Sequence, residues 1–441
     1  MSDSYYIRGG KPLKGEIVLS GAKNVALKTI IAALMFESKV ELENIPRIND
    51  VLDLIELVKA VGGRVNFNEK NSLQIDGSGL KENKIDLFYG SKIRVSFLFF
   101  APLLLKFGEC LVPNPGGCRL GARPIDRIVE GMKSLGVKVD YDSKTGYYKA
   151  KITTPPAGRY RFPKPSHTGT ELLILIALMT DKEVVIENGA NEPEIDDLIV
   201  FLNEAGARIK KQDDKIIVNK SLPLSQKFPF KIISDRNEFV TYATLAVASK
   251  GDVVVGNIPS TSVESFLNKM EEAGSGIDKL PGNKFRFFYK GPVKSVDIET
   301  SPHPGFMTDW QPNFAVFLTT ASGESIIHER LFENRFSYVE ELKKLGAEIE
   351  FFEPSVTNPK GFYHFNWEEG KKYQQAIKIK GGHPLHNGVL TIKDLRAGAA
   401  LACAALLSSG ESIINGVSQL ERGYENFVVK IRALGGDIKK I

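Results

Sequence analysis

The pattern of Leu345-Gly346-Ala347-Glu348-Ile349-Glu350 recurs along the chain and indicates its architecture. In each copy an apolar residue ends a helical stretch, a glycine follows, and a short β-rich run comes next. The glycines of the six copies are Gly62, Gly136, Gly206, Gly274, Gly346 and Gly435. A glycine directly after a helix suits the positive φ that the chain needs before it turns into a strand. We therefore expect six repeats, each of which joins a helix to a strand.

Apolar helices are the second landmark of these repeats. Most are followed by a polar pair and a β-branched run, as at Gly108-Glu109, Gly251-Asp252, Gly323-Glu324 and Gly410-Glu411. The helices expected at 172–179 and 397–407 are apolar on nearly every side, which indicates burial. The sequence thus predicts an α/β fold with two similar domains of three repeats each. Buried helices would lie inside a shell of sheets and outer helices.

The composition of the 441-residue chain is that of a globular protein, with 42% hydrophobic and 25% charged residues. No apolar run reaches the roughly 18 residues of a membrane span, and the polar start Met1–Tyr6 is unlike a secretory leader, so we expect a cytosolic protein. Three irregularly spaced cysteines predict neither a disulfide framework nor a zinc site. The net charge of +5 comes from scattered residues, so an anionic small ligand explains it as well as nucleic acid does.

Charged and polar residues stand where the buried helices are expected to begin. A helix N-terminus offers unpaired N–H groups and a positive dipole end, so these places suit anions. If the helices bundle, their starts converge into one site for a phosphorylated, carboxylated ligand, with carboxylates to move a proton. Taken singly, each residue could be a helix cap or a surface ion pair, but the recurrence favours a site. The starts are Ser20-Gly21-Ala22-Lys23-Asn24, Lys92-Ile93-Arg94, Ser166-His167-Thr168-Gly169-Thr170, Asp235-Arg236-Asn237-Glu238, Thr308-Asp309 and Asp394-Leu395-Arg396.

A glycine-rich loop at 113–126 carries one of the three cysteines, Cys118. Arg119 and Arg123 flank this thiol, so we expect it to ionise readily and to act as a nucleophile or proton donor. An inert core residue is the ordinary interpretation of a lone cysteine. It suits Cys110 and Cys403, which lie in apolar runs. The setting of Cys118 favours reactivity instead.

These motifs make the chain resemble, nearly end to end, the UDP-N-acetylglucosamine 1-carboxyvinyltransferases among the enolpyruvyl transferases. The resemblance implies an inside-out α/β barrel of βαβαββ-type units in two domains. The first would comprise residues 1–22 and 235–441, and the second residues 23–234 with the Cys118 loop. The motifs are those at 20–24 and 117–126, Glu187-Asn188, Glu192-Pro193-Glu194-Ile195, Pro302-His303-Pro304, Thr308-Asp309, Phe332-Glu333-Asn334-Arg335-Phe336, Asp394-Leu395-Arg396-Ala397 and Arg422-Gly423-Tyr424-Glu425.

The resemblance also implies the chemistry. The 3-hydroxyl of UDP-N-acetylglucosamine would attack the second carbon of phosphoenolpyruvate while the methylene carbon is protonated, and the tetrahedral intermediate would then lose phosphate. This is the first committed step of peptidoglycan synthesis and the target of fosfomycin. The resemblance implies no metal or organic cofactor, no nucleic-acid or membrane partner, and a cytoplasmic enzyme that we expect to be a monomer.

Residue roles follow from the same resemblance, position by position. Lys23, Arg123 and Arg422 would hold the phosphate, Arg396 would face the carboxylate of phosphoenolpyruvate, and Asn24 would bond in the same pocket. Asp309 would be the base, and Cys118 the acid, able to form a covalent adduct with phosphoenolpyruvate. The nucleotide-sugar site would be lined by Arg94, Arg123, Pro124, Ile125, Asp126, Arg127, Lys164, Ser166, His167, Asp309 and Leu331.

The chain departs from the family pattern in three places. His167-Thr168 stands where smaller or apolar residues are frequent, and Val240 replaces a common glycine. The segment 351–393 is longer than expected, and the alternation in 362–367 predicts a strand of an added hairpin, which we interpret as a surface elaboration. His383 and His386 in this segment are weak evidence for a metal, because no third ligand accompanies them.

Two other functions remain open. An enolpyruvyl transferase acting on shikimate 3-phosphate would not carry Cys118 and the Arg-Pro-Ile-Asp run at 123–126 in this form. A non-catalytic binder of nucleotide sugars or nucleic acid would be expected to have lost some of the reactive residues. It would lack one or more of Lys23, Cys118, Asp309, Arg396 and Arg422, all of which are present.

Overall fold

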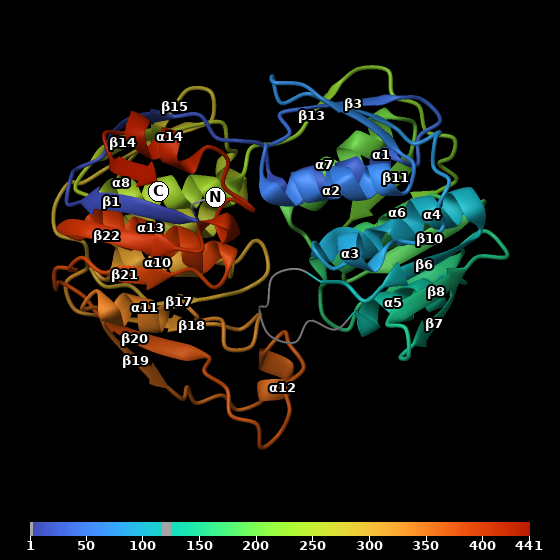
Figure 1. Cartoon of the computed structure of the whole chain (residues 1–441). Coiled ribbons are helices and arrows are strands. Elements are labelled where there is room, and N and C mark those ends of the chain that lie inside the picture. The colour runs from blue at the N-terminus through green and yellow to red at the C-terminus, as the bar shows by residue number, and fades with distance from the viewer. Residues whose placement is uncertain (1–2, 117–124) are drawn as a thin grey trace. The chain divides into compact units, whose positions relative to one another are not determined.

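The computed structural model describes residues 3–116 and 125–441, which divide into two compact units (Figure 1). Unit 1 holds the chain up to Ser20 and the stretch Ser234–Ile441. Unit 2 holds the described residues from Gly21 to Ile233. Each unit has its own cluster of buried apolar side chains. Four residues singled out in the sequence lie outside the described residues: Cys118, Arg119, Arg123 and Pro124.

Unit 1 contains three repeats. Each repeat consists of a strand, an inner helix, a second strand, an outer helix and two further strands. The first consists of β2 (Lys14–Ile17), α8 (Arg236–Ala248), β14 (Asp252–Val255), α9 (Glu264–Glu272), β15 (Gly276–Leu280) and β16 (Lys284–Phe288). The second consists of β17 (Ile298–Glu299), α10 (Gln311–Leu318), β18 (Glu324–His328), α11 (Val339–Lys344), β19 (Glu348–Phe352) and β20 (Ala376–Lys380). The third consists of β21 (Val389–Thr391), α13 (Leu395–Leu407), β22 (Gly410–Asn415), α14 (Phe427–Ala433), β23 (Asp437–Lys440) and the N-terminal β1 (Ser4–Gly9).

Unit 2 follows the same plan. Its first repeat has β13 (Phe230–Lys231), α1 (Lys23–Ala33), β3 (Val40–Glu43), α2 (Asn49–Ala60), β4 (Arg64–Phe67) and β5 (Leu73–Asp76). Its second has η1 (Arg94–Phe99), α4 (Phe100–Phe107), β6 (Glu109–Pro113), α5 (Asp126–Ser134), β7 (Lys138–Asp142) and β8 (Tyr147–Lys151). Its third has β9 (Gly158–Arg161), α6 (His167–Ala177), β10 (Glu183–Glu187), α7 (Pro193–Glu204), β11 (Arg208–Gln212) and β12 (Lys215–Asn219). Short helices α3 (Leu87–Gly90), η2 (Ser260–Ser262), α12 (Pro359–Phe362) and η3 (Val417–Gln419) lie between these elements.

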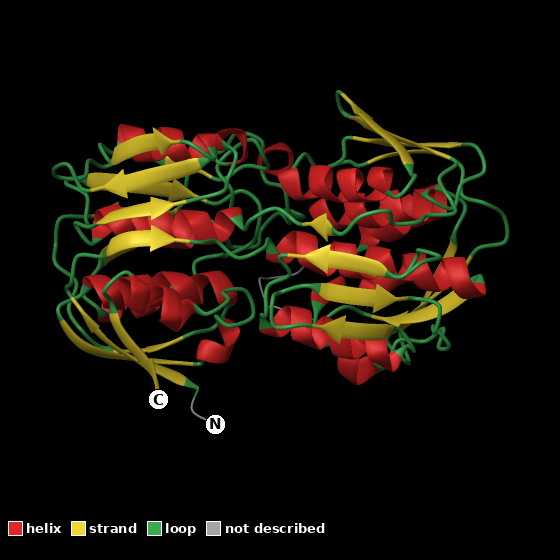
Figure 2. Cartoon of the chain, turned by 90° about the horizontal axis from the view of Figure 1, so that it is seen from above, coloured by secondary structure: helices red, strands yellow, loops and turns green. Residues whose placement is uncertain are grey.

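Each repeat builds one sheet, so the described residues form six sheets. In five of them one parallel pair is continued by two antiparallel strands, as in the order β17-β18-β20-β19. In the three-stranded sheet β6-β8-β7, an isolated parallel bridge between Lys84 and Leu111 stands in place of the parallel strand. Strand β1 completes the C-terminal sheet, with Ile7 opposite both Ser412 of β22 and Ile438 of β23. Figure 2 shows helices and strands interleaved within each unit.

The inner helices are buried because they are apolar on nearly all sides. In unit 1, α8, α10 and α13 contact one another, and α13 is buried from Leu395 to Leu406. In unit 2, α4 contacts both α1 and α6. All six repeat glycines have positive φ, between 82° and 104°. The predicted fold class is confirmed.

The strand predicted for 362–367 is wrong. Helix α12 ends at Phe362, and the chain then runs without a helix or strand to β20 at Ala376. The aromatic side chains of this irregular segment pack on one another, with the rings of Tyr363 and Trp367 stacked at 4.7 Å and those of Trp367 and Tyr373 tilted at 4.4 Å. Aromatic packing within one irregular segment therefore replaces strand pairing.

Candidate active site

Asp309 lies between two buried arginines in unit 1. The residue sits in the turn before α10, and its Oδ1 accepts a hydrogen bond from Nη2 of Arg335 at 2.6 Å. Its Oδ2 accepts one from Nε of Arg396 at 3.1 Å. Arg396 is the second residue of α13, whose first turn is capped by the Asp394 carboxylate through the backbone N–H groups of Arg396 and Ala397. The helix start predicted at 394–396 thus places Arg396 in contact with Asp309, the predicted base.

The two arginines control the protonation of Asp309. Burial alone would raise the pKa of the Asp309 carboxyl. The charges of Arg335 and Arg396 and their hydrogen bonds outweigh burial and hold that pKa well below its usual range. Asp309 is therefore a firmly ionised carboxylate and a weak proton acceptor while both arginines remain in place.

A second layer of hydrogen bonds fixes Arg335 and the backbone of Leu331. The hydroxyl of Thr308 accepts a hydrogen bond from Nη1 of Arg335 at 2.6 Å and donates one to Oε2 of Glu329 at 2.7 Å. The other oxygen of the buried Glu329 accepts from the backbone N–H of Leu331 at 2.8 Å. Asp309, Arg335 and Arg396 form what we call the Asp309 cluster. The bonds of Thr308 and Glu329 join Leu331, expected in the nucleotide-sugar site, to this cluster.

Two N–H groups of this cluster have no hydrogen-bond acceptor among the described residues. Nη1 of Arg396 and Nε of Arg335 are buried, and neither donates to an acceptor among the described residues. Guanidinium N–H groups bind planar anions well, so these two donors suit an anionic ligand. The guanidinium of Arg396 also lies 5.6 Å from the centre of the Tyr424 ring, whose hydroxyl meets that of Thr241 at 2.7 Å. Arg422, two residues before Tyr424, donates to Oε1 of Gln419 at 3.3 Å.

Unit 2 carries the other described residues that the sequence predicts for the site. Lys23, the first residue of α1, places Nζ 2.5 Å from Oδ2 of the buried Asp50. Asn24 follows in the same helix, and Arg94 begins η1. Ile125 precedes α5, which begins at Asp126 and Arg127, and the carbonyl of Arg127 accepts a hydrogen bond from the Tyr160 hydroxyl at 2.8 Å.

The start of α6 adds Lys164, Ser166 and His167. The Ser166 hydroxyl caps the helix by accepting from the backbone N–H of Gly169. Burial first, and then the nearby charge of Arg127, lower the pKa of Lys164. Nε2 of His167 lies 3.2 Å from Oε1 of Glu171. This end of unit 2 therefore gathers several cationic side chains.

The two described cysteines are buried, as predicted. Burial raises the pKa of the Cys403 thiol to about 12 and moves the pKa of Cys110 in the same direction. Within the described residues no group of three or more His, Cys, Asp or Glu side chains could hold a metal ion. His383 pairs with Glu348 at 3.2 Å on the surface.

Sequence reasoning missed several partners. Arg335 lies in the motif at 332–336, but the sequence indicates no role for it, and neither Glu329 nor Asp50 is marked by a motif. Asp50 stands at the start of α2, so the rule applied to the inner helices could have found it. Arg335 and Glu329 lie in irregular segments, where no periodicity marks them.

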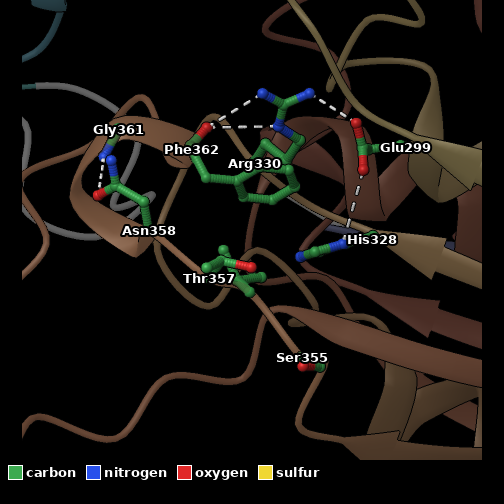
Figure 3. Close-up of a pocket in the computed structure, with 9 residues that line it drawn as sticks. Glu299, His328, Arg330, Ser355, Thr357, Asn358, Gly361 and Phe362 are labelled. Atoms are coloured by element: carbon green, nitrogen blue, oxygen red, sulfur yellow. Dashed lines mark hydrogen bonds and ion pairs between the residues drawn. The ribbon is translucent and has the colours of Figure 1, made fainter.

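A cavity of about 640 Å³ lies elsewhere in unit 1, beside the inserted segment. Figure 3 shows Arg330 between Glu299 and the carbonyl oxygen of Phe362, with His328 next to Glu299. The guanidinium of Arg330 also stacks 4.0 Å from the centre of the Phe362 ring. None of the residues predicted for the active site lines this cavity.

The fold described above is that of the enolpyruvyl transferases. The family model of EPSP synthase (3-phosphoshikimate 1-carboxyvinyltransferase) matches residues 7–431, and the chain belongs to this family. Among solved structures, the enolpyruvyl transferase NikO from Streptomyces tendae has a TM-score of 0.85 at 20% identity, covering 100% of this chain and 99% of that one. An EPSP synthase from Acinetobacter baumannii has a TM-score of 0.74 at 15% identity, with 99% of both chains covered. At such identities these structures support the fold alone.

Full-length relatives carry a more specific name. The UDP-N-acetylglucosamine 1-carboxyvinyltransferase 1 of Carboxydothermus hydrogenoformans is 36% identical over 440 residues, covering 100% of this chain and 98% of the relative. The UDP-N-acetylglucosamine 1-carboxyvinyltransferase of Halothermothrix orenii is 37% identical, with 99% of both chains covered. That of Thermotoga maritima is 35% identical, with 99% and 98% covered. The family resemblance predicted from the motifs is confirmed.

Proposed function

We propose that this chain transfers the enolpyruvyl group of phosphoenolpyruvate to the 3-hydroxyl of UDP-N-acetylglucosamine and releases phosphate, the first committed step of peptidoglycan synthesis. The observation that carries the proposal is the full-length match, at 36% and 37% identity, to relatives named for this activity. The rival acceptor, shikimate 3-phosphate, is favoured by the name of the family model. Two solved structures of that name share 16% and 15% identity with this chain.

The Asp309 cluster supplies the carboxylate-binding part of the reaction. Arg396 donates a hydrogen bond to Asp309 through Nε. Its buried Nη1 has no acceptor among the described residues. A carboxylate is the planar anion that a guanidinium fork binds best. We assign Arg396 to the carboxylate of phosphoenolpyruvate, with Asp309 as its counter-ion before the substrate binds.

Substrate binding would activate Asp309 as the base. When the substrate carboxylate takes hydrogen bonds from Arg396, the hold of that arginine on Asp309 weakens, and the pKa of Asp309 rises from its depressed value. Asp309 can then accept the proton of the 3-hydroxyl as that oxygen bonds to the second carbon of phosphoenolpyruvate. The acid adds a proton to the methylene carbon. Elimination then breaks the bond between the second carbon and the phosphate oxygen, and a proton leaves the methyl group.

Lys23, Arg123 and Arg422 would neutralise the phosphate. Asp50 holds the ammonium of Lys23 at 2.5 Å, which positions this cation at the start of α1. Arg94, Ile125, Asp126, Arg127, Lys164, Ser166 and Leu331 would contact the nucleotide sugar. The roles of Cys118, Arg123 and Pro124 rest on the sequence, because these residues lie outside the described part.

Location and assembly are part of the proposal. No helix in the described ranges is long and apolar enough to cross a membrane. We expect a cytoplasmic monomer that serves cell-wall synthesis, and hence cell shape and division, and that fosfomycin inhibits.

Phosphate release with two alternative acceptors tests the function. The purified chain is mixed with phosphoenolpyruvate and either UDP-N-acetylglucosamine or shikimate 3-phosphate, and phosphate is followed by a coupled assay. Continuous release with the nucleotide sugar alone is expected. Release with shikimate 3-phosphate alone would replace the proposal with the rival function, and release with neither would favour a non-catalytic binder.

A further inference from the structure

Two oppositely charged side chains face each other in the apolar interior of unit 2. Nζ of Lys28 on α1 lies 3.3 Å from Oε2 of Glu171 on α6. The two side chains are 4% and 0% exposed, and their neighbours in both helices are buried as well. Moving two charges out of water is costly, and apolar residues of similar size often serve packing as well or better. The pair therefore calls for a role besides packing.

Glu171 also contacts a second cationic group. Its other oxygen, Oε1, lies 3.2 Å from Nε2 of His167, one helical turn earlier in α6. Neither oxygen of Glu171 accepts a well-formed hydrogen bond from the described residues. Lys28 and His167 thus share one buried carboxylate, through one oxygen each.

His167 is the member of this group that reaches solvent. Its side chain keeps 22% of its surface exposed, whereas its Nε2 atom is enclosed. The exposed surface therefore belongs to the remaining atoms of the side chain. As the first residue of α6, His167 follows Ser166 and lies three residues after Lys164. The buried carboxylate fixes one edge of the ring and leaves the rest of the side chain accessible at the end of the helix.

The surrounding charges act on His167 in opposite directions. Burial lowers the pKa of the His167 imidazole, and the charge of Lys28 on α1 also lowers it. Glu171 on the same helix raises it, as does Glu192, which precedes α7. The carboxylates win, so the pKa of His167 is raised above its usual value. Protonation is consequently favoured below that raised pKa and lost as the pH rises through it.

We propose that Glu171, itself held by Lys28, positions His167 as a cationic contact for the diphosphate of the nucleotide sugar. Lys164, with Arg127 close enough to lower its pKa, supplies further positive charge beside the start of α6. A diphosphate is the part of the proposed substrates that needs several such cations. The inference rests on the proposed function and adds to it a pH-dependent affinity for one substrate.

The two positioning residues give opposite predictions, which separates them from a purely structural pair. The Michaelis constant for UDP-N-acetylglucosamine is measured against pH with saturating phosphoenolpyruvate. Glu171→Gln removes the charge that favours imidazolium, so the inflection of the profile should move to lower pH. The KM near neutral pH should rise roughly tenfold, the loss typical of one charge-assisted contact. Lys28→Met removes a charge that opposes imidazolium, so its inflection should move to higher pH. The kcat should change little in both.

A double variant and a surface control complete the experiment. Glu171→Gln leaves Lys28 without its buried partner, so Lys28→Met/Glu171→Met, which buries neither charge, keeps the test independent of folding. It should shift the inflection downward, as Glu171→Gln does. His383→Gln removes a histidine that pairs with Glu348 at the same 3.2 Å on the surface of unit 1, and it should leave the profile unchanged.

Three outcomes would overturn the inference. One is an unshifted profile in the folded variants with only the melting temperature changed. Another is a shift of both single variants in the same direction, and the third is a wild-type profile without an inflection. Failure of the proposed function would differ, because the wild-type protein itself would then not turn over UDP-N-acetylglucosamine.

Discussion

Nε of Arg396 donates a hydrogen bond of 3.1 Å to Oδ2 of Asp309, so the proposed carboxylate-binding arginine and the proposed base neutralise each other. This pairing links substrate binding to proton transfer. A carboxylate with a strongly depressed pKa is a poor proton acceptor. It becomes a better one when one of the paired arginines binds another anion instead. The carboxylate of phosphoenolpyruvate is such an anion.

Replacing Asp309 with asparagine should abolish most of the turnover. Asp309→Asn keeps the size of the side chain and removes the proton acceptor, so kcat should fall by about 10²- to 10⁴-fold. Initial rates of phosphate release measure the loss. Asp252→Asn, which breaks a half-exposed pair with Arg286, is the matched control and should keep wild-type kcat. A fully active Asp309→Asn protein would mean that another group accepts the proton.

Removing Arg335 should shift the pH dependence of kcat. Because Arg335 helps to hold the pKa of Asp309 down, Arg335→Met should raise that pKa, and the acidic limb of the kcat profile should move to higher pH. Arg330→Met removes a neighbouring arginine that pairs with Glu299 instead, and its acidic limb should not move. An identical acidic limb in Arg335→Met and wild type would exclude Asp309 as the titrating base.

Stability should respond to the same substitution. A carboxyl whose pKa is depressed on folding stabilises the protein above its unfolded pKa, and that contribution is lost as the pH falls through the folded value. Asp309 therefore stabilises unit 1 at neutral pH. Truncating a partner in a buried pair costs about 3–5 kcal/mol, and the 23% exposure of Asp309 places the cost of Arg335→Met at the lower end. Urea unfolding at pH 7 gives the difference, and an unchanged midpoint would contradict it.

Lys23→Ala should weaken phosphoenolpyruvate binding in the complex with the nucleotide sugar. Losing one cation of a multiply charged anion site costs on the order of 2–5 kcal/mol. Calorimetric titration measures the change. Lys59→Ala, which removes a half-exposed lysine paired with Glu56, is the control and should bind normally. Equal phosphoenolpyruvate affinity for Lys23→Ala and wild type would remove Lys23 from the anion site.

Fosfomycin should modify Cys118 alone. Cys110 and Cys403 are buried, and burial raises the pKa of each thiol, so both should stay unreactive. Cys118→Asp keeps an acid without a nucleophile and should turn over while escaping the drug. Peptide mass spectrometry after treatment with fosfomycin and UDP-N-acetylglucosamine locates the adduct. An adduct on Cys110 or Cys403 would show that the loop at 113–126 was misinterpreted.

The fold could be predicted from the sequence because its repeats recur. Contacts between distant segments could not be predicted in this way. The six glycines and the apolar helices recur, so their pattern stood out without any partner being known. The alternating pattern at 362–367 led to the wrong prediction of a strand. Such a pattern gives the spacing of aromatic residues but not the surface against which each ring packs. Lys28 and Glu171 escaped notice although each lies within an apolar helix, since nothing local indicates that the two charges meet.

The product of the reaction distinguishes the two possible acceptors. The chain is incubated with phosphoenolpyruvate and an equal mixture of UDP-N-acetylglucosamine and shikimate 3-phosphate, and both acceptors are examined by mass spectrometry. We predict that UDP-N-acetylglucosamine gains one enolpyruvyl group while shikimate 3-phosphate stays unchanged. Enolpyruvylation of shikimate 3-phosphate with the nucleotide sugar left intact would contradict the account.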